Sequence, residues 1–308
     1  MTGVVCFVVM AFASFAQQTP WEKYSAAGVK AHREGRLLDA EKLFEDALEE
    51  AKASGAEDAR LATSLMNLAH VKKGLGKFDD VESLFSRALA IREKVLGADH
   101  LDVASSLNEL GMFYYQQTQP QYVGRRRFII IESLVPWNMR PDLISIEPGQ
   151  RQTILLLEKY LQAEPLLKRA LRIRERVLPP EHGDVAMSAH NLGELFRAAG
   201  RYGEAEPLLR RALGIREKIY GPDDTRVADS QLSLAETYLS QKRFEKAEPL
   251  YQRALAIREK SLGREHIKVA ETCEAYSALL RETKRGTEAG KMEVRAKRIL
   301  SSQKKPNQ

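Results

Sequence analysis

The chain has 308 residues, 44% of them hydrophobic, which is enough to bury the core of a large domain. Its 48 basic and 42 acidic residues give a net charge of +6, but the two signs alternate along the sequence, as in residues 91–94 (Ile-Arg-Glu-Lys). A nucleic-acid-binding protein would instead gather basic residues on one face beside aromatic ones. The pattern argues against nucleic-acid binding and favours a solvated outer face for these segments.

Residues 1–16 form an apolar segment without a charged side chain. The segment is short for a membrane span, and Ser14-Phe15-Ala16 places small residues at the two positions that a signal peptidase reads. We therefore expect a signal peptide that is cleaved before Gln17 and an exported protein, periplasmic or secreted. The alternative is a wrongly assigned start codon or an uncleaved tether, because the usual basic residues at the N-terminus are missing.

A unit of 42 residues recurs along the chain after this segment. The spacing is clearest at Ala170, Ala212 and Ala254, each within a run of the form Leu-x-x-Arg-Ala-Leu-x-Ile-Arg-Glu. Within one unit, apolar residues recur at helical spacing, stop at Gly200-Arg201 and then resume, which predicts a helix, a short turn and a second helix. A regular period of this size indicates stacked helical pairs that bury their apolar faces against one another.

Small and aromatic residues occupy fixed positions in these units, which in the fourth unit are Leu192, Gly193, Phe196, Gly200, Tyr202, Ala205, Leu209 and Ala212. This pattern resembles the tetratricopeptide repeat, whose usual period is about 34 residues. The additional residues of each unit are similar to the long repeats of kinesin light chains. The resemblance implies an all-α, right-handed solenoid that binds protein partners. No heptad coiled coil precedes the repeats, so the likeness is confined to the repeat region.

We expect about six repeats, at residues 21–56, 58–97, 100–179, 182–221, 224–263 and 266–300, followed by a disordered polar tail at 301–308. The first and last repeats depart from the pattern, as expected for the ends of an array. Pro165, Pro207 and Pro249 are predicted to begin second helices, because the missing N–H of proline is tolerated best in that position.

The third repeat carries additional sequence. His182, Asp224 and His266 recur every 42 positions, whereas His100 and His182 are 82 apart, which leaves 40 residues that we place at 118–157. This insertion falls in the turn between the two helices of the repeat, where repeat proteins accommodate insertions.

The insertion contains three strand-like apolar runs, at 128–131, 143–146 and 154–157, separated by prolines. It is either a β-rich excursion with a role of its own or non-native sequence, such as a retained intron or a gene-model error. We favour the second interpretation, because the insertion contains no recognisable chemical motif.

The sequence contains no pattern typical of catalysis or metal binding. Residues 74–77 (Gly-Leu-Gly-Lys) fail the phosphate-loop pattern, because Phe78 follows the lysine and no strand precedes it. His100, His182 and His266 lie a whole repeat apart, so they cannot share one metal ion and are expected at the starts of helices. We therefore expect no enzymatic activity, no cofactor and no metal.

In tetratricopeptide arrays the first helix of each repeat lines a concave groove. The resemblance implies that the groove is lined here by Asn67, His70, Asn108, Glu109, Met112, His190, Asn191, Glu194, Arg197, Ser233 and Glu236. An asparagine amide both donates to and accepts from an extended peptide backbone. Kinesin light chains use asparagines at matching positions, which implies this role for Asn67 and Asn191. The alternative is a solvated polar face without a ligand.

The leading hypothesis is an exported, non-enzymatic scaffold that binds a peptide or protein partner of unknown identity in the concave groove. The alternative is a cytoplasmic regulatory or signalling adaptor that controls a nucleic-acid-binding or signalling partner. The location of the mature protein distinguishes the two.

Overall fold

The computed structural model describes residues 18–53, 55–118 and 148–303. These residues fall into two compact units, Met1–Val95 and Leu96–Gln308. They form twelve helices and no strand, so the predicted all-α fold is confirmed for the described part of the chain. The predicted insertion and its first two strand-like runs lie mostly outside the described residues.

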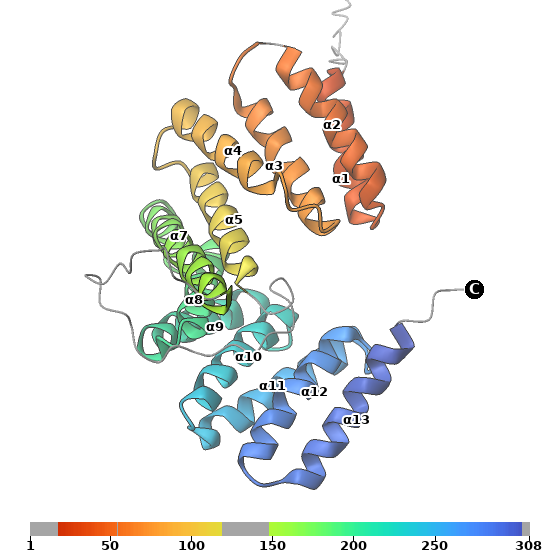
Figure 1. The fold of residues 1–308 in the computed structure, drawn as a ribbon, viewed down its shortest axis with the longest axis vertical. Coiled ribbons are helices and arrows are strands. Elements are labelled where there is room, and N and C mark those ends of the chain that lie inside the picture. The colour runs from red at the N-terminus through yellow and green to blue at the C-terminus, as the bar shows by residue number, and fades with distance from the viewer. Residues whose placement is uncertain (1–17, 54, 119–147, 304–308) are drawn as a thin grey trace, which may run out of the picture. The chain divides into compact units, whose positions relative to one another are not determined.

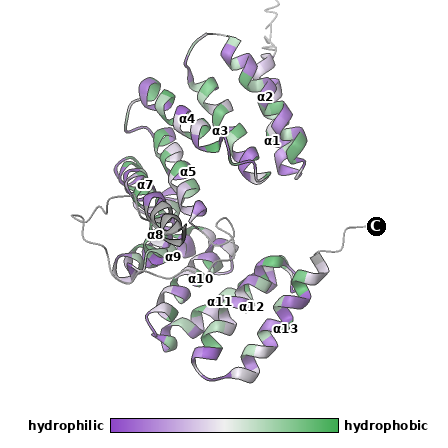
Figure 2. Ribbon diagram, in the orientation of Figure 1, coloured by the Kyte–Doolittle hydropathy of each residue, from purple (hydrophilic) through white to green (hydrophobic). Residues whose placement is uncertain are grey.

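The first unit contains two helical pairs: α1 (Pro20–Arg33) with α2 (Leu37–Ala53), and α3 (Ala59–Gly74) with α4 (Val81–Leu96), which ends at the unit boundary. The second unit contains four further pairs: α5 (Leu101–Gln117) with α7 (Pro148–Val177), α8 (Gly183–Ala198) with α9 (Tyr202–Tyr220), α10 (Thr225–Ser240) with α11 (Phe244–Leu262), and α12 (Ile267–Glu282) with α13 (Gly286–Gln303) (Figure 1). Each helix of this unit packs against the next one along the chain. Hydrophobic and hydrophilic residues are mixed along every helix, as amphipathic packing requires (Figure 2).

The first helices of the second unit begin at capping side chains. The Nδ1 atoms of His100, His182 and His266 each accept a hydrogen bond at 3.1 Å from the backbone N–H two residues later. Asp224 occupies the same position before α10 and accepts from the Arg226 N–H at 2.8 Å. The cap satisfies a backbone donor that the helix itself leaves unpaired. The prediction that the repeated histidines begin helices is confirmed.

Small residues set the distance between the two helices of a pair. A Cβ added to Gly193 would lie 2.8 Å from the side chain of Leu209, and one added to Gly111 would lie 2.8 Å from Leu167. Both leucines are fully buried, so neither has room to move away. A larger residue at either glycine would therefore push the two helices of its pair apart.

The prolines of the second helices do not lie where the sequence pattern predicted. Pro207 and Pro249 lie inside α9 and α11, five residues after the first residues of those helices, and Pro165 lies far inside α7. The three prolines are exposed. Proline costs a helix one backbone hydrogen bond, and on the exposed side the freed carbonyl can bond to water.

The prediction of a strand at 154–157 is wrong, because these residues belong to α7. In the other pairs of this unit the second helix begins at Tyr202, Phe244 or Gly286, whereas α7 begins twelve residues before its matching position, Tyr160. A short apolar run does not by itself distinguish a strand from a buried helix. The end of the insertion thus extends the second helix of its repeat.

The repeat register continues across the insertion. Lys218 pairs with Glu181, and Lys260 with Asp223, each across 37 positions. The matching pair of the third repeat, Arg176 with Asp99, spans 77 positions, which is 40 more. The 40 additional residues inferred from the histidine spacing therefore agree with the spacing of these ion pairs.

Candidate binding surface on the first helices

The first helices of successive pairs in the second unit lie next to one another. Helix α8 contacts α5 on one side and α10 on the other, and α10 also contacts α12. Side chains from the four helices therefore share one surface. We call this surface the first-helix face. It consists of the predicted groove residues of three helices and the matching residues of α12. These are Asn108, Glu109 and Met112 on α5, His190, Asn191, Glu194 and Arg197 on α8, Ser233 and Glu236 on α10, and Glu274, Ala275, Ala278 and Arg281 on α12.

A charged cluster joins α8 to α10 in this face. Two nitrogens of Arg197 donate to both oxygens of Glu194, one turn earlier on α8, at 3.0 and 2.7 Å. A third nitrogen of Arg197 lies 3.1 Å from a carboxylate oxygen of Glu236 on α10. The side chains of Glu194, Arg197 and Glu236 are 15%, 20% and 30% exposed, so the cluster is accessible but largely shielded from water. The structure thus brings together three residues that the sequence assigned to the groove.

The two carboxylates of the cluster differ in their electrostatics. Burial raises the pKa of Glu194, but the charge and hydrogen bonds of Arg197, with a further hydrogen bond from Ser233, outweigh it and lower this pKa to about 2. Burial also raises the pKa of Glu236, and there the single contact with Arg197 does not offset it. The difference follows from geometry, because a paired fork of hydrogen bonds stabilises a carboxylate more than one contact does.

Two buried polar groups beside this cluster have no hydrogen-bond partner among the described residues: Nδ1 of His190 and the hydroxyl of Tyr251. Burial, followed by the nearby charge of Arg216, lowers the pKa of His190 to about 4, so its imidazole is neutral at pH 7. Tyr251 is 0% exposed, and burial together with the charge of Glu236 raises the pKa of its hydroxyl. The cluster therefore borders on hydrogen-bonding groups that the fold leaves unsatisfied.

Two asparagines that were predicted to line the groove, Asn108 on α5 and Asn191 on α8, form a hydrogen bond with each other. The side-chain amide of Asn191 donates to Oδ1 of Asn108 at 2.9 Å. Asn108 is 2% exposed, whereas Asn191 is half-buried. This bond ties neighbouring first helices together, so Asn191 has a structural role in addition to any contact with a ligand.

The remaining predicted positions are divided between the two units. Glu109 and Met112 are half-buried on α5, and Ser233 is 7% exposed on α10. Asn67 and His70 lie on α3 in the first unit, where the His70 ring packs edge-on against Phe85 with the ring centroids 5.3 Å apart.

A series of buried arginines was not predicted from the sequence. Arg174, Arg216 and Arg258 stand 42 positions apart in the Ile-Arg-Glu segments that we assigned to a solvated face, yet they are 2%, 9% and 4% exposed. That assignment is wrong for these residues. Each donates at 2.7 Å to the hydroxyl of a residue 14 positions later, on the next first helix: Ser188, Ser230 or Thr272. Ser188, Ser230 and Thr272 recur with the same 42-residue period, and this recurrence is the sequence signal that could have predicted the buried arginines.

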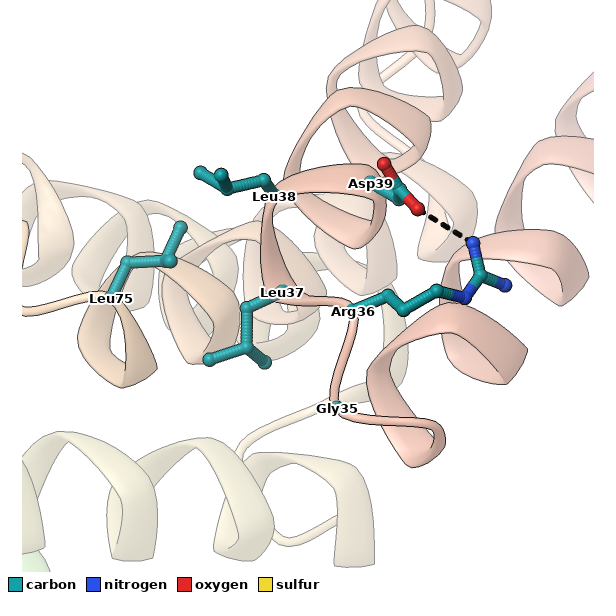
Figure 3. A pocket seen from close by; sticks show the side chains of 6 residues that line it. All are labelled: Gly35, Arg36, Leu37, Leu38, Asp39 and Leu75. Carbon is teal, nitrogen blue, oxygen red and sulfur yellow. Dashed lines mark hydrogen bonds and ion pairs between the residues drawn. The ribbon is translucent and has the colours of Figure 1, made fainter. Parts of the chain in front are cut away.

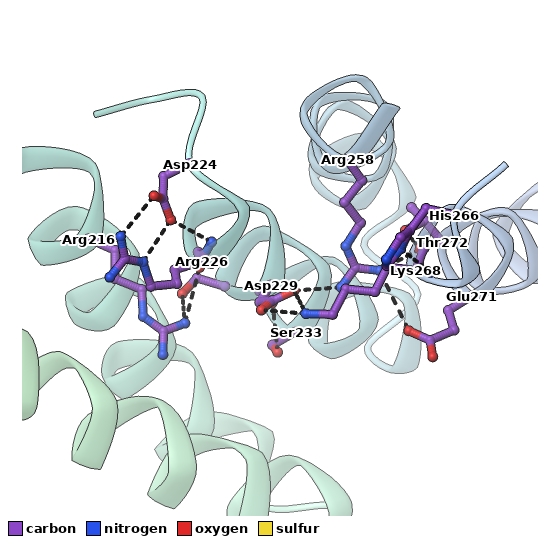
Figure 4. A network of polar contacts seen from close by, with 11 residues as sticks. Arg216, Asp224, Arg226, Asp229, Ser233, Arg258, His266, Lys268, Glu271 and Thr272 are labelled. Atoms are coloured by element: carbon purple, nitrogen blue, oxygen red, sulfur yellow. Dashed lines mark hydrogen bonds and ion pairs between the residues drawn. The ribbon is translucent and has the colours of Figure 1, made fainter. Parts of the chain in front are cut away.

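One of these arginines also binds a carboxylate on the first helix of its own pair. Arg258 donates to a carboxylate oxygen of Asp229 at 2.6 Å, and Lys268 lies 3.3 Å from the same carboxylate (Figure 4). Burial raises the pKa of Asp229, but the two cations outweigh it and hold the pKa below its ordinary value. Two cations thus balance the negative charge of Asp229, whereas Glu236 shares the single cation Arg197 with Glu194.

A shallow hollow lies at the turn between α1 and α2 in the first unit, lined by Gly35, Arg36, Leu37, Leu38, Asp39 and Leu75 (Figure 3). Arg36 binds Asp39 at its edge at 2.6 Å, and Leu38 is 67% exposed. The hollow has few polar groups that would orient a ligand, so it is a weaker candidate than the first-helix face.

Within residues 18–53, 55–118 and 148–303, no helix has the length and apolar character needed to cross a membrane. The same residues contain no cluster of three or more His, Cys, Asp or Glu side chains suited to a metal ion.

The sequence matches the family model of the tetratricopeptide repeat at residues 24–94, 60–121, 152–218, 184–260 and 224–301. None of the curated proteins matches the sequence. Among solved structures, a kinesin light chain-like protein of Podosopora anserina with nearly identical TPR-like repeats is 20% identical, with a TM-score of 0.55 over 80% of this chain and 99% of the other.

Two further solved structures have similar TM-scores. BtubC (BKLC) from P. vanneervenii is 19% identical, with a TM-score of 0.54 over 94% of this chain and 96% of its own. PilW, a type IV pilus biogenesis factor, is 15% identical, with a TM-score of 0.56 over 90% and 92% of the two chains. At these identities the similarity concerns the fold alone.

Proposed function

The chain belongs to the tetratricopeptide repeat family, and we propose that it is a non-enzymatic scaffold that binds an extended segment of a partner protein on its first-helix face. Tetratricopeptide repeats serve in general as protein–protein interaction scaffolds. The adjacency of α5, α8, α10 and α12 supports the proposal, because it offers a continuous surface to a chain that crosses the helices.

The observation that carries the proposal is the half-buried cluster of Glu194, Arg197 and Glu236 beside the unsatisfied hydroxyl of Tyr251. Charged and polar groups that are shielded from water but still accessible bind a ligand more strongly than fully solvated ones. The described residues contain no cluster of three or more His, Cys, Asp or Glu side chains suited to a metal ion. The arrangement of charged and hydrogen-bonding groups suits the recognition of a peptide.

The proposal is tested by probing the full-length protein with an array of random-sequence synthetic peptides. Ala278 on α12 matches the position of Glu236 and is exposed, so Ala278→Trp should fold normally while blocking the face. Ala256→Trp, at an exposed position on the second helix α11, is the matched control. We expect Ala278→Trp to abolish peptide binding and Ala256→Trp to leave it unchanged. Equal binding by both variants, or no binding by the unmodified protein, would reject this function.

We also propose that residues 1–16 direct export and are removed. The composition of this segment supports the proposal, and the segment lies outside the described residues. N-terminal sequencing of the protein expressed with its own leader should find Gln17 first. A chain that retains Met1 or Thr2 would instead favour the cytoplasmic adaptor.

A further inference from the structure

The first-helix face carries an excess of negative charge although the whole chain carries +6. Its acidic residues at the predicted groove positions and their α12 equivalents are Glu109, Glu194, Glu236 and Glu274. The basic residues at the same positions are Arg197 and Arg281. Arg281 donates to both carboxylate oxygens of Glu293 on α13, at 2.7 and 2.8 Å, so it is already engaged. Arg197 is therefore the basic residue at these positions that pairs with carboxylates of the face.

Glu194 and Glu236 share this one guanidinium. The two-pronged contact with Glu194 takes most of the hydrogen-bonding capacity of Arg197, and Glu236 receives a single contact at 3.1 Å. Burial and the negative charge of Glu194 raise the pKa of Glu236, and the charges of Arg197 and Arg258 do not offset this rise. One more cation beside Glu236 would complete the neutralisation of the pair.

An independent feature lies at the same place. The side chain of Tyr251 is 0% exposed, its hydroxyl makes no hydrogen bond within the described part of the chain, and the charge of Glu236 acts on it. A phenolic oxygen accepts a hydrogen bond from an ammonium or guanidinium N–H. A cation that reached Glu236 would therefore come near an acceptor that has no partner among the described residues.

We infer that the first-helix face recognises a Lys or Arg side chain of the partner, whose cation contacts Glu236 between α8 and α10. The inference rests on the proposed function and names the chemistry of its ligand. Glu236 is 30% exposed, which leaves a path for an incoming side chain. The partner segment is basic at this position because an acidic residue would face the negative charge that Glu194 and Glu236 together retain beside one guanidinium.

The test uses the tightest-binding peptides from the array. In each of them, every Lys is replaced in turn by norleucine and every Arg by citrulline, which keep the length of the side chain and remove its charge. Dissociation constants are measured for the unmodified protein, for Glu236→Gln and for Glu245→Gln. Glu245 is an exposed carboxylate on α11, so its variant carries the same net charge without altering the face.

For the unmodified protein and for Glu245→Gln, we expect that neutralising one Lys or Arg of the peptide raises the dissociation constant at least about tenfold. For Glu236→Gln the same replacement should leave the dissociation constant almost unchanged. Glu236→Lys should reverse the preference and favour peptides with Asp or Glu at that position. Circular dichroism establishes that each variant is folded.

If tight-binding peptides lack Lys and Arg, or if neutralising these residues weakens binding to Glu236→Gln as much as to the unmodified protein, the inference is wrong. The proposed function would then still stand, provided that Ala278→Trp blocks binding. If Ala278→Trp does not block binding, both are wrong.

Discussion

The guanidinium of Arg258 donates to the hydroxyl of Thr272 at 2.7 Å and so links the second helix of one pair to the first helix of the next. The same guanidinium nitrogen donates to the backbone carbonyl of Lys268 at 2.8 Å. Arg216 makes the matching contacts with Ser230, at 2.7 Å, and the Arg226 carbonyl, at 3.1 Å. These buried arginines are one polar connection between successive pairs, in addition to the bonds between their first helices.

Replacing Arg216 with Met should destabilise the protein. The substitution leaves the Ser230 hydroxyl and the Arg226 carbonyl without their donor in a buried position, which costs about 1–3 kcal/mol for each unsatisfied group. We expect a loss of roughly 2–4 kcal/mol in the free energy of unfolding, measured by urea denaturation. Arg253→Met, an exposed position on α11, is the control and should change stability by less than about 0.5 kcal/mol. Equal effects from the two substitutions would mean that the buried contacts contribute nothing.

Truncating Asn191 and truncating Asn67 should have different effects on stability. Asn191→Ala removes the donor to Asn108, whose side chain is buried, so we expect a loss of about 1–2 kcal/mol in unfolding free energy. Asn67 is half-buried on α3, and its truncation should cost less than about 0.5 kcal/mol. The double variant Asn108→Ala/Asn191→Ala checks the cause, because it should cost less than the sum of the two single changes.

His190 should make stability depend on pH. Its pKa is about 4 in the folded chain, below its ordinary value of 6.5, so the unfolded chain takes up the proton first as the pH falls. The contribution of this residue is complete above pH 6.5 and is lost between pH 6.5 and 4, with an upper limit of about 3 kcal/mol.

Leu232 occupies the matching position on α10, so His190→Leu is a substitution that the repeat already accommodates. Urea denaturation between pH 7 and 4 should show a smaller loss of stability for this variant than for the unmodified protein. Parallel pH profiles would contradict the low pKa of His190, as would an imidazole NMR titration with a midpoint near 6.5.

The fold could be predicted from the sequence to the extent that its contacts repeat. The capping histidines and the 42-residue register could be predicted, because a residue that recurs once per repeat has the same surroundings in each repeat. Arg216 was misjudged because its neighbours Glu217 and Lys218 are typical of a solvated helix face. The partner that keeps it buried, Ser230, lies on another helix.

The sequence predicted individual residues of the candidate site but not the contacts between them. Glu194 and Glu236 were assigned to the groove by their repeat positions, but their sharing of Arg197 depends on how closely α8 approaches α10. That distance is a property of packing and leaves no local signal. The same reason explains why Tyr251 was not predicted, since the two preceding repeats have Leu167 and Leu209 at its position and a tyrosine there has the sequence pattern of an ordinary core residue.

Most of the insertion should be dispensable for the fold, and the structure indicates where to cut. Thr118 is 1% exposed and ends α5, and its hydroxyl donates to the Tyr115 carbonyl at 2.6 Å, so it belongs to the repeat. Lys159 lies 4.5 Å from the ring centre of Tyr114, as Arg201 lies 4.2 Å from that of Phe196. The deletion should therefore keep Thr118 and Lys159 and remove the 40 residues between them, 119–158.

The shortened turn needs one further change. The residues that match Thr118 in the next three repeats, Gly200, Lys242 and Lys284, have φ angles of 73°, 58° and 61°, whereas Thr118 has a φ of −84°. A β-branched residue is strained at positive φ, so the deletion should be combined with Thr118→Gly. Removing a long connection regains little loop-closure entropy, about 0.6 kcal/mol per halving of its length.

We expect the variant to retain its helical circular dichroism signal per residue and to melt at the same temperature as the full chain or slightly above it. The stability of a repeat array is approximately the sum of its units and their interfaces. The removed residues are the connection between α5 and α7 and the start of α7, which precedes the part of this helix that matches the other second helices. The same deletion with Thr118 retained should melt at a lower temperature, which tests the positive φ of the new turn. A variant that fails to fold with glycine in place would show that residues 119–158 contribute to the core of the array.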